Sequence, residues 1–184
     1  EPGSESASND FFFLEREEPE EILSTLLTIV RDRIPKRLGV DPIMDIQVLA
    51  PMHRGTLGIG ELNLKLQACL NPPQQHRSET SAYGTVFREG DKVLQTSNNY
   101  DKEVFNGDIG RIKTINIAEK NLTVHFDVRK VVYDFSELDE LTLAYAITIH
   151  KSQGSEFPVV VMPLAMQQYL LLQRNLLYTG LTRG

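Results

Sequence analysis

The chain has 184 residues, of which 41% are hydrophobic and 24% are charged, and its formal net charge is -6. This balance is typical of a folded globular protein and excludes the disordered, collagen-like and membrane-embedded classes. No run approaches the roughly 18 consecutive apolar residues that a spanning helix needs, so no membrane partner is expected. The length exceeds one average domain and falls short of two.

The negative charge is concentrated at the beginning of the chain. Residues 1–21 hold eight acids and one base, whereas the remaining residues hold 17 acids and 18 bases. Binding of nucleic acid is driven by basic side chains that neutralise phosphates, so the net charge of -6 alone would argue against it. The near-neutral remainder removes that argument, and global charge neither excludes nor indicates a nucleic-acid partner.

The first residues and the cysteine content indicate that the chain comes from a longer protein and that this protein is cytoplasmic. It starts at Glu1 rather than at a methionine and opens with small and polar residues, so we expect a disordered tail over residues 1–10 and a longer parent protein. The single cysteine, Cys69, cannot form an internal disulfide. This favours a reducing compartment, and we expect a cytoplasmic protein.

Short apolar runs alternate with helical segments over the first part of the chain, which is the pattern of a parallel α/β sheet. Residues 11–14 are a candidate strand. A helix is predicted to begin at Pro19 and to end at Gly39. Residues 45–50 predict a second strand and residues 61–70 a second helix, which Asn71, Pro72 and Pro73 stop. The polar interval up to Ala82 is interpreted as a linker.

From residue 84 to 138 the pattern changes to short strands separated by tight turns. Asn106-Gly107 predicts a hairpin turn, because both residues tolerate a positive φ. Residues 122–126 alternate between apolar and polar, so one face of that strand is expected to be buried. Further turns are predicted at Lys120-Asn121 and Arg129-Lys130. A unit of this size indicates a small closed or sandwich-like barrel, since closure removes exposed strand edges.

After Leu141 the α/β pattern returns. Residues 143–147 and 157–162 are predicted to be buried strands, and residues 167–178 a helix. The barrel therefore interrupts one α/β domain. The predicted organisation is a discontinuous α/β lobe over residues 11–83 and 139–184, with an inserted barrel over residues 84–138.

The most informative segment runs from Thr148 to Phe157, where a strand ends in a hydroxyl-rich turn. Backbone N–H groups and short side-chain donors in such a turn can hold phosphate oxygens. The alternative is a solvated strand-to-helix connection without a ligand. For a loop of this composition alone, that alternative is the better interpretation.

Three blocks of sequence favour the phosphate-binding turn over the solvated connection, because they occur in the order found in one family of proteins. Residues 144–157 closely resemble motif V of superfamily 1 DNA helicases of the RecD-like type, the alpha subunit of exodeoxyribonuclease V and its relatives. Residues 48–63 resemble motif IV, and residues 177–183 resemble motif VI. The barrel, with Gly90-Asp91-Lys92-Val93 and residues 98–110, is similar to the SH3-like barrel inserted into the second lobe of these helicases.

The resemblance covers nearly everything from residue 46 to the end. It implies an α/β fold of the RecA-like, P-loop-NTPase type with a parallel sheet, interrupted by a small all-β SH3-like barrel. In motif V of the family, the hydroxyl and imidazole positions contact the backbone of single-stranded DNA. Those positions are Thr148, His150 and Ser152, with Lys151 close by, and the contacts are expected to be independent of base sequence.

Two aromatic residues of the predicted barrel are weaker candidates for the same ligand. Tyr100 and Phe105 flank the predicted hairpin and could stack on a base, because aromatic faces bind single strands without reading sequence. An aromatic residue beside a turn more often packs on its own small core. We keep Tyr100 as a candidate DNA-binding residue with that alternative open.

The resemblance also implies nucleotide contacts. Gly154 permits close approach of the backbone, and Glu156 is expected to reach the nucleotide ribose or to order the loop. Arg183 corresponds to the motif VI arginine, whose guanidinium neutralises charge on the γ-phosphate in the transition state. Arg54 is the motif IV counterpart, although its context suits a surface salt bridge equally well. Arg183 and Arg54 are therefore the candidate catalytic residues.

The phosphate loop of this family is missing from the chain. No glycine is followed by lysine, and the paired acids that hold Mg²⁺ in the family are not recognisable, so no metal ligand is predicted here. We expect the chain alone not to hydrolyse ATP. ATP and Mg²⁺ would bind in the parent enzyme through an N-terminal RecA-like lobe. Gly184 stands where the family usually has alanine, so the end of motif VI is a departure or a truncation.

The expected parent is an ATP-dependent DNA helicase of DNA repair or recombination, moving 5′ to 3′ on single-stranded DNA as the resemblance implies. Its expected partners are that DNA, the N-terminal lobe and other exonuclease subunits. Two alternatives remain open. One is a non-catalytic interaction module built on a degenerate helicase lobe, and the other is the helicase part of a conjugative relaxase.

Overall fold

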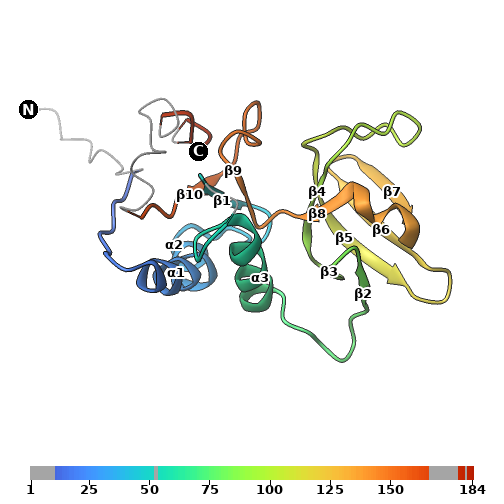
Figure 1. The fold of residues 1–184 in the computed structure, drawn as a ribbon, viewed down its shortest axis with the longest axis horizontal. Helices are drawn as coiled ribbons and strands as arrows, with labels where there is room; N and C mark the ends of the chain where they lie inside the picture. Colours follow the sequence, from blue (N-terminus) through green and yellow to red (C-terminus); the bar gives the residue numbers. More distant parts are fainter. Residues whose placement is uncertain (1–10, 52–53, 166–177, 181) are drawn as a thin grey trace, which may run out of the picture.

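The computed structural model describes residues 11–51, 54–165, 178–180 and 182–184. These residues form two lobes that lie side by side, an α/β lobe and a β-barrel (Figure 1). The predicted tail over residues 1–10 and nearly all of the predicted helix over residues 167–178 lie outside the described residues. Within the described part of the chain, no helix is long and apolar enough to cross a membrane.

The α/β lobe is built on a parallel sheet of three strands. The central strand, β1 (Ile46–Ala50), lies between β10 (Val159–Val161) and β9 (Ala146–Thr148). Ile46 is opposite Val159 at one end of β1, and Ala50 is opposite Thr148 at the other. Every residue of β1 is buried, as expected for a strand with a neighbour on each side and a helix layer across one face. The predicted parallel α/β sheet is confirmed.

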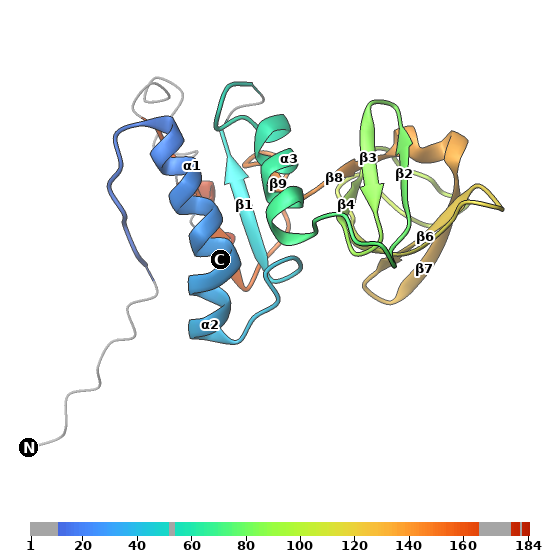
Figure 2. The same ribbon diagram turned by 90° about the horizontal axis from the view of Figure 1, so that it is seen from below.

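Helices from the first part of the chain cover one face of this sheet (Figure 2). The predicted helix over residues 19–39 consists of α1 (Pro19–Thr28), a π-helical turn (Ile29–Arg33) and α2 (Ile34–Leu38). It begins with proline, whose missing N–H costs nothing at a first helical position. It ends where Gly39 adopts a left-handed φ of 70°. Inside it, Pro35 cannot donate to the carbonyl one turn earlier, which favours local rewinding.

The second covering helix, α3 (Ile59–Leu70), also closes an edge of the sheet. The side chain of Asn63 donates to the carbonyl of Ala146 (2.9 Å) and accepts from the amide of Ala146 (3.0 Å). Among the residues that the structure describes, β9 is the last strand in this sheet, so those backbone groups have no strand partner on that side. One amide side chain therefore satisfies both polar groups that an edge strand leaves exposed.

The barrel is an antiparallel sheet with the strand order β7-β6-β5-β4-β8, accompanied by the hairpin β2–β3. Its strands are β2 (Glu79–Ala82), β3 (Thr85–Arg88), β4 (Lys92–Gln95), β5 (Ile109–Asn116), β6 (Asn121–Phe126), β7 (Arg129–Asp134) and β8 (Leu141–Leu143). A 3-10 helix over Phe135–Glu140 precedes β8. In β6 the side chains alternate between half-buried and buried, as the sequence predicts.

Several local expectations are corrected. Residues 11–14 form no strand, and all four side chains are at least 50% exposed. The turn predicted at Arg129-Lys130 falls two residues earlier, where Asp127 has a φ of 32°, and both basic residues lie inside β7. At Asn106-Gly107 a turn does occur, since the amide of Asp108 donates to the carbonyl of Phe105. Only the glycine there has a positive φ, of 103°.

The barrel also extends past the limits expected from the sequence. The hairpin begins at Glu79, inside the expected linker. β8 pairs with β4, so the barrel sheet reaches Leu143 rather than ending near residue 138. Two chain segments therefore cross between the lobes, the one that follows α3 and the step from β8 to β9.

Candidate nucleic-acid and nucleotide interface

The candidate site residues gather where parallel strands end. Ala50 and Thr148 are register partners at the carboxyl ends of β1 and β9, so the motif IV segment and the motif V turn leave the same edge of the sheet. Open α/β sheets bind ligands outside the carboxyl ends of their strands. The topology of this lobe thus brings two of the three sequence blocks together.

The turn after β9 is wound tightly by its own backbone. The amide of Lys151 donates to Thr148 Oγ1 (3.0 Å), and the amide of Ser152 donates to the carbonyls of Thr148 (3.2 Å) and Ile149 (3.3 Å). Two further amides, of Gln153 and Ser155, donate to carbonyls of the same turn. These N–H groups are occupied within the turn. For these four amides the expectation of free donors is wrong, whereas the exposed side chains of the turn are open to a ligand.

The side chains of this turn divide into two sets. Thr148 is 7% exposed and Ser152 is fully buried, with its hydroxyl donating to the carbonyl of Ile149 at 2.7 Å. His150 and Lys151 are exposed. The hydroxyl residues therefore shape the turn from inside, and the imidazole and the ammonium group face solvent. The sequence predicts the four positions, but not this division of labour.

Beyond the turn, the chain reverses toward β10. Gly154 has a φ of 86°, which L side chains rarely adopt, and Glu156 is exposed. Phe157 is 8% exposed, and its amide donates to the carbonyl of Arg183 at 2.8 Å. A hydrogen bond between backbone groups therefore connects the end of motif V to the end of motif VI.

Arg183 is half-buried and anchored close to its own backbone. Its Nε donates to the carbonyl of Thr179 (3.2 Å), and its amide donates to the carbonyl of Gly180 (3.2 Å). No partner among the described residues holds its two Nη groups. Gly180 is buried, and a Cβ at this position would lie 2.4 Å from the sulfur of Met162. The missing side chain at Gly180 thus lets the segment that carries Arg183 pack against the sheet.

Arg54 lies at the opening of a shallow hollow that Gly55, Thr56 and Glu61 also line. It is exposed and has no hydrogen bond or ion pair within the described ranges. The surface salt bridge weighed as its alternative role is therefore not formed with any residue described. Among the described residues, no hydrogen bond or ion pair connects Arg54 to Arg183. Met52 and His53 of the motif IV block lie outside the described residues.

The aromatic pair of the barrel is on the surface. Tyr100 is 74% exposed and Phe105 is 43% exposed, and their rings meet edge to face with centroids 6.0 Å apart. They belong to the connection between β4 and β5. Asn99 and Val104 bridge the two sides of this connection, and the side-chain amide of Asn99 donates to the carboxylate of Glu140. A firmly held loop thus presents the two rings, which do not pack into the barrel core.

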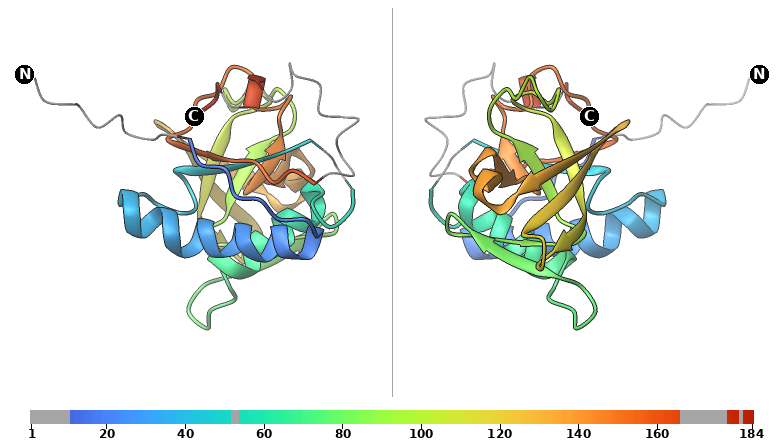
Figure 3. Two further views of the ribbon diagram at one scale, coloured as in Figure 1. Left: turned by 90° about the vertical axis from the view of Figure 1, so that its left-hand side faces the viewer. Right: turned by 90° about the vertical axis from the view of Figure 1, so that its right-hand side faces the viewer.

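The turn after β9 and the β4–β5 connection rise on the same side of the molecule. Both are uppermost in Figure 1 and stay uppermost when the molecule is turned by 90° about the vertical axis in Figure 3. The loop that carries His150 and Lys151 and the loop that carries Tyr100 and Phe105 therefore project toward the same side of the molecule. A linear ligand running along that side would meet both lobes.

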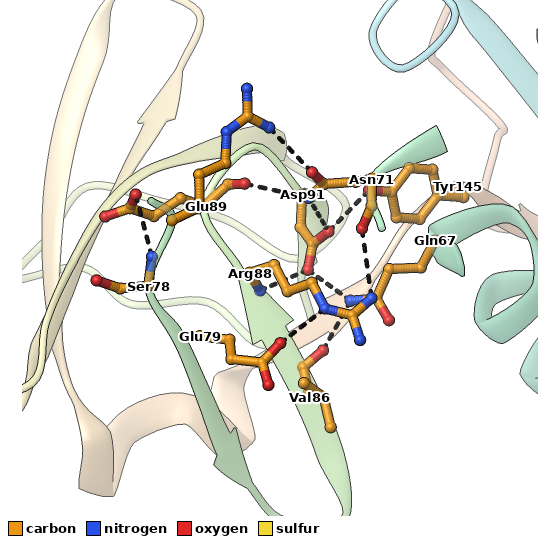
Figure 4. A network of polar contacts seen from close by, with 10 residues as sticks. Gln67, Asn71, Ser78, Glu79, Val86, Arg88, Glu89, Asp91 and Tyr145 are labelled. Carbon is orange, nitrogen blue, oxygen red and sulfur yellow. Dashed lines mark hydrogen bonds and ion pairs between the residues drawn. The ribbon is translucent and has the colours of Figure 1, made fainter. Parts of the chain in front are cut away.

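Sequence reasoning treated Gly90-Asp91-Lys92-Val93 only as a marker of the barrel, yet its charged pair forms the joint between the lobes. Asp91 is completely buried and accepts four hydrogen bonds (Figure 4). The donors are Gln67 Nε2 (2.7 Å), Asn71 Nδ2 (2.7 Å), Tyr145 Oη (2.8 Å) and the amide of Arg88 (2.7 Å). Burial raises the pKa of Asp91, and these hydrogen bonds oppose the rise.

Comparison with family models identifies both lobes. Residues 62–126 match the SH3 domain of ATP-dependent RecD-like DNA helicases, and residues 143–184 match the UvrD-like helicase C-terminal domain. The first match contains Asp91, Lys92 and most of the barrel. The second contains the turn after β9 and Arg183.

Curated relatives agree with the family models. The chain is 43% identical to the ATP-dependent RecD2 DNA helicase of Deinococcus radiodurans over 76% of its length. It is 31% identical to the RecBCD enzyme subunit RecD of Haemophilus influenzae over 76% of its length. It spans 19% and 20% of those two relatives, about one fifth of each.

Solved structures support the fold. A Pif1 helicase from Bacteroides, crystallised in complex with ADP-AlF3 and single-stranded DNA, matches 90% of this chain with a TM-score of 0.56 and 18% identity. A second Pif1 structure, of DNA unwinding at forked double-stranded DNA, matches 92% of the chain with a TM-score of 0.52 and 19% identity. The chain covers 43% and 45% of those proteins. The predicted RecA-like α/β fold with an inserted barrel is confirmed.

Proposed function

The chain belongs to the RecD-like DNA helicases, and from that premise we propose that it is the second motor lobe of an ATP-dependent helicase that moves on single-stranded DNA. The proposal extends to a role in DNA repair or recombination and to a cytoplasmic location. The observation that carries it is the shared sheet edge, where Ala50 and Thr148 bring the motif IV segment and the motif V turn together.

The DNA backbone would run along the side of the molecule that carries both exposed loops. His150 and Lys151 would contact phosphates, because they are the exposed side chains of a tightly wound turn. Thr148 and Ser152 would hold that turn in shape, and a direct contact from Ser152 would require its hydroxyl to leave the carbonyl of Ile149. Tyr100 would stack on a base, because its ring faces solvent.

The nucleotide would be shared with a preceding RecA-like lobe of the same parent chain. The sequence holds no phosphate loop, so that lobe would supply the lysine, the hydroxyl and the acids that bind ATP and Mg²⁺. Arg183 fits a role toward the γ-phosphate, because its Nη groups have no partner among the described residues while its Nε is anchored. A fixed guanidinium placed in this way stabilises charge that develops in the transition state.

Three further residues would belong to the nucleotide-binding site. Arg54 would act from the hollow at the beginning of α3 as a second guanidinium. Gly154 would allow the backbone to approach, and Glu156 would reach the ribose or order the loop. In the parent, closure of the lobes on ATP and opening after hydrolysis would step the pair along DNA in the 5′ to 3′ direction. Other exonuclease subunits are candidate partners.

The deciding experiment is an Arg183→Ala change in the full-length helicase, with DNA-stimulated ATP hydrolysis as the readout. Removal of an arginine finger lowers the rate by about 10³-fold or more in other nucleotide hydrolases, and we expect a loss of that order. The matched control is Arg33→Ala, because Arg33 is an exposed arginine of the π-helical turn and lies outside the three motif blocks. An unchanged rate in Arg183→Ala would overturn the assignment and favour a non-catalytic interaction module.

The DNA contact is tested by measuring the affinity for single-stranded DNA against salt concentration. Each phosphate contact on a single strand contributes about 0.7 to the slope of log K against log salt, so Lys151→Ala should reduce the slope by about that amount. Lys36→Ala is the control, because Lys36 is an exposed lysine of α2, which belongs to the helices that cover one face of the sheet. If both variants keep the wild-type slope, Lys151 is not a phosphate contact.

A further inference from the structure

Two adjacent residues at the beginning of β4 fasten the barrel to opposite parts of the α/β lobe. Successive side chains of a strand point to opposite faces, so Asp91 and Lys92 leave the barrel in different directions. Asp91 meets the end of α3 and Tyr145, as Figure 4 shows. Lys92 meets the beginning of β1 and the end of motif V. One dipeptide therefore fixes the barrel on two sides.

Lys92 is a buried cation, and no carboxylate among the described residues forms an ion pair with it. It is 1% exposed, and its Nζ donates to the carbonyls of Met44 and Ile46, both at 3.2 Å. The aromatic face of Phe157 lies 5.6 Å from Nζ, within the range of a cation–π contact. Burial lowers the pKa of Lys92 to about 8, and the charges of Asp41 and Asp45 oppose this from a distance. The group is costly to bury, because its direct contacts are with neutral groups and the two carboxylates act only from a distance.

Phe157 contacts both Lys92 and motif VI. Its ring is buried beside Lys92, and its amide donates to the carbonyl of Arg183 at 2.8 Å. The amide and the carbonyl of Arg183 are thus both held, the first by Gly180 and the second by Phe157. Two consecutive contacts therefore lead from a barrel strand to the residue that the proposed function places at the γ-phosphate.

We propose that Lys92 is a positioning residue that sets the place of Arg183 through Phe157, and so couples the position of the barrel to nucleotide hydrolysis. The inference rests on the proposed function for the role of Arg183, but the contacts themselves do not. The barrel carries the exposed rings on the DNA side, so displacement of the barrel by DNA moves the Lys92 ammonium group against the ring of Phe157. A shift of about 1 Å in a catalytic group can change a rate 100-fold, which makes a small movement effective.

The test begins with Lys92→Met, which keeps an unbranched side chain and removes the charge. In the 184-residue chain, exchange of the Phe157 amide with solvent is followed by NMR. We expect it to accelerate roughly 10-fold, because the ring loses its cation and the hydrogen bond to Arg183 opens more often. The amide of Ala144 donates to the backbone carbonyl of Lys92 and reports whether β4 stays attached. Its exchange should not change.

Stability separates positioning from a structural role. A methionine at this place removes the cost of burying a charge, so the midpoint of urea unfolding should stay at or above the wild-type value. Lys113→Met is the matched control, because Lys113 is an exposed lysine of β5 in the same barrel. It should alter neither the Phe157 amide nor the unfolding midpoint.

The same variants in the full-length helicase test the consequence for catalysis. Lys92→Met should lower kcat for ATP roughly 10- to 100-fold and leave KM for ATP nearly unchanged, because a misplaced guanidinium acts mainly in the transition state. Phe157→Leu should lower kcat similarly. The double variant should be no worse than either single variant, since both interrupt one chain of contacts.

The outcomes are distinguishable from those of the proposed function. Unchanged exchange of the Phe157 amide together with unchanged kcat in Lys92→Met would overturn the coupling. Multiplicative losses in the double variant would also overturn it, and this comparison remains available through Phe157→Leu if Lys92→Met folds poorly. If Arg183→Ala leaves hydrolysis intact, the proposed function fails, but the exchange measurement still decides whether Lys92 positions Arg183.

Discussion

The joint between the lobes and the edge of the parallel sheet use polar residues in opposite ways. At the joint, Asp91 and Lys92 are at most 1% exposed, and their polar atoms are held by named partners. At the edge, His150 and Lys151 are exposed, and Arg54 has no partner within the described residues. Polar groups that are buried and satisfied set geometry, whereas polar groups left in solvent are available to a ligand.

The contrast assigns different consequences to substitutions in the two regions. Truncation of Asp91 at the joint should lower the stability of the folded chain, because it leaves buried donors without partners, whereas Lys92→Met also removes the cost of burying a charge. Changes at the exposed edge should leave stability unchanged and act on ligands alone. The turn after β9 contains residues of both kinds, which allows the comparison within a few residues.

The largest effect is expected at Asp91. Asp91→Ala removes the acceptor of four donors and should lower the free energy of unfolding by about 4 kcal/mol. Three of these donors are the side chains of Gln67 in α3, of Asn71 just after it and of Tyr145 in the β8–β9 connection. Urea unfolding of the 184-residue chain measures this. Asp101→Ala, at an exposed aspartate of the β4–β5 connection, should change it by less than about 0.5 kcal/mol. A loss below about 1 kcal/mol at Asp91 would contradict the contrast.

Lys92 should give the joint a dependence on alkaline pH. Its folded pKa of about 8 lies below the ordinary value of 10.5, so between these values the unfolded chain holds a proton that the folded chain lacks. Stability from this group therefore increases as pH rises through that window, by about 3 kcal/mol in total, and is constant below it. The measurement is the difference in unfolding free energy between wild type and Lys92→Met from pH 7 to 10. A difference independent of pH would show that Lys92 titrates normally.

Within the turn, Ser152 tests the buried kind of residue. Ser152→Ala removes the hydrogen bond from Oγ to the carbonyl of Ile149 and should cost about 1 kcal/mol of unfolding free energy. Ser97→Ala is the control, because Ser97 is exposed in the β4–β5 connection. Equal values for the two serines would mean that the buried hydroxyl contributes nothing measurable to the turn.

The smallest effect on stability is expected two residues away, at His150. The imidazole is exposed, so His150→Ala should change the unfolding free energy by less than about 0.5 kcal/mol. The same change in the full-length helicase should weaken binding to single-stranded DNA, measured by fluorescence anisotropy. A loss of stability above about 1 kcal/mol would place His150 with the structural residues of the turn.

The elements with strong local periodicity could be predicted from the sequence. The helix from Pro19 to Gly39 has a proline at its first position, a glycine after its end and an apolar face, and β6 alternates strictly. Neither signal depends on distant residues. The two family blocks that end β1 and β9 could also be placed, because they follow buried apolar runs.

The joint could not be predicted, because its partners are remote. Asp91 is bound by Gln67, 24 residues earlier, and by Tyr145, 54 residues later, and nothing near Asp91 in the sequence marks a buried acid. The sequence places residues 141–143 on the wrong side of the boundary for the same reason, since their pairing with β4 depends on residues far away in the chain. The burial of Ser152 likewise follows from the winding of its turn rather than from its residue type.

The placement of β1 has a consequence for the order in which the newly made chain can fold. The β1 side chain of Gln47 donates to the carbonyl of Ala144, 97 residues later, and both neighbours of β1 follow the barrel in the sequence. During synthesis, the strands of the barrel emerge together and can pair at once. Both edges of β1 stay unpaired until residues 146–161, which form β9 and β10, have been synthesised. Contacts between residues so far apart in the sequence form slowly. The ribosome-bound chain therefore exposes β1, an aggregation-prone strand, until the folded barrel has brought β9 and β10 next to it.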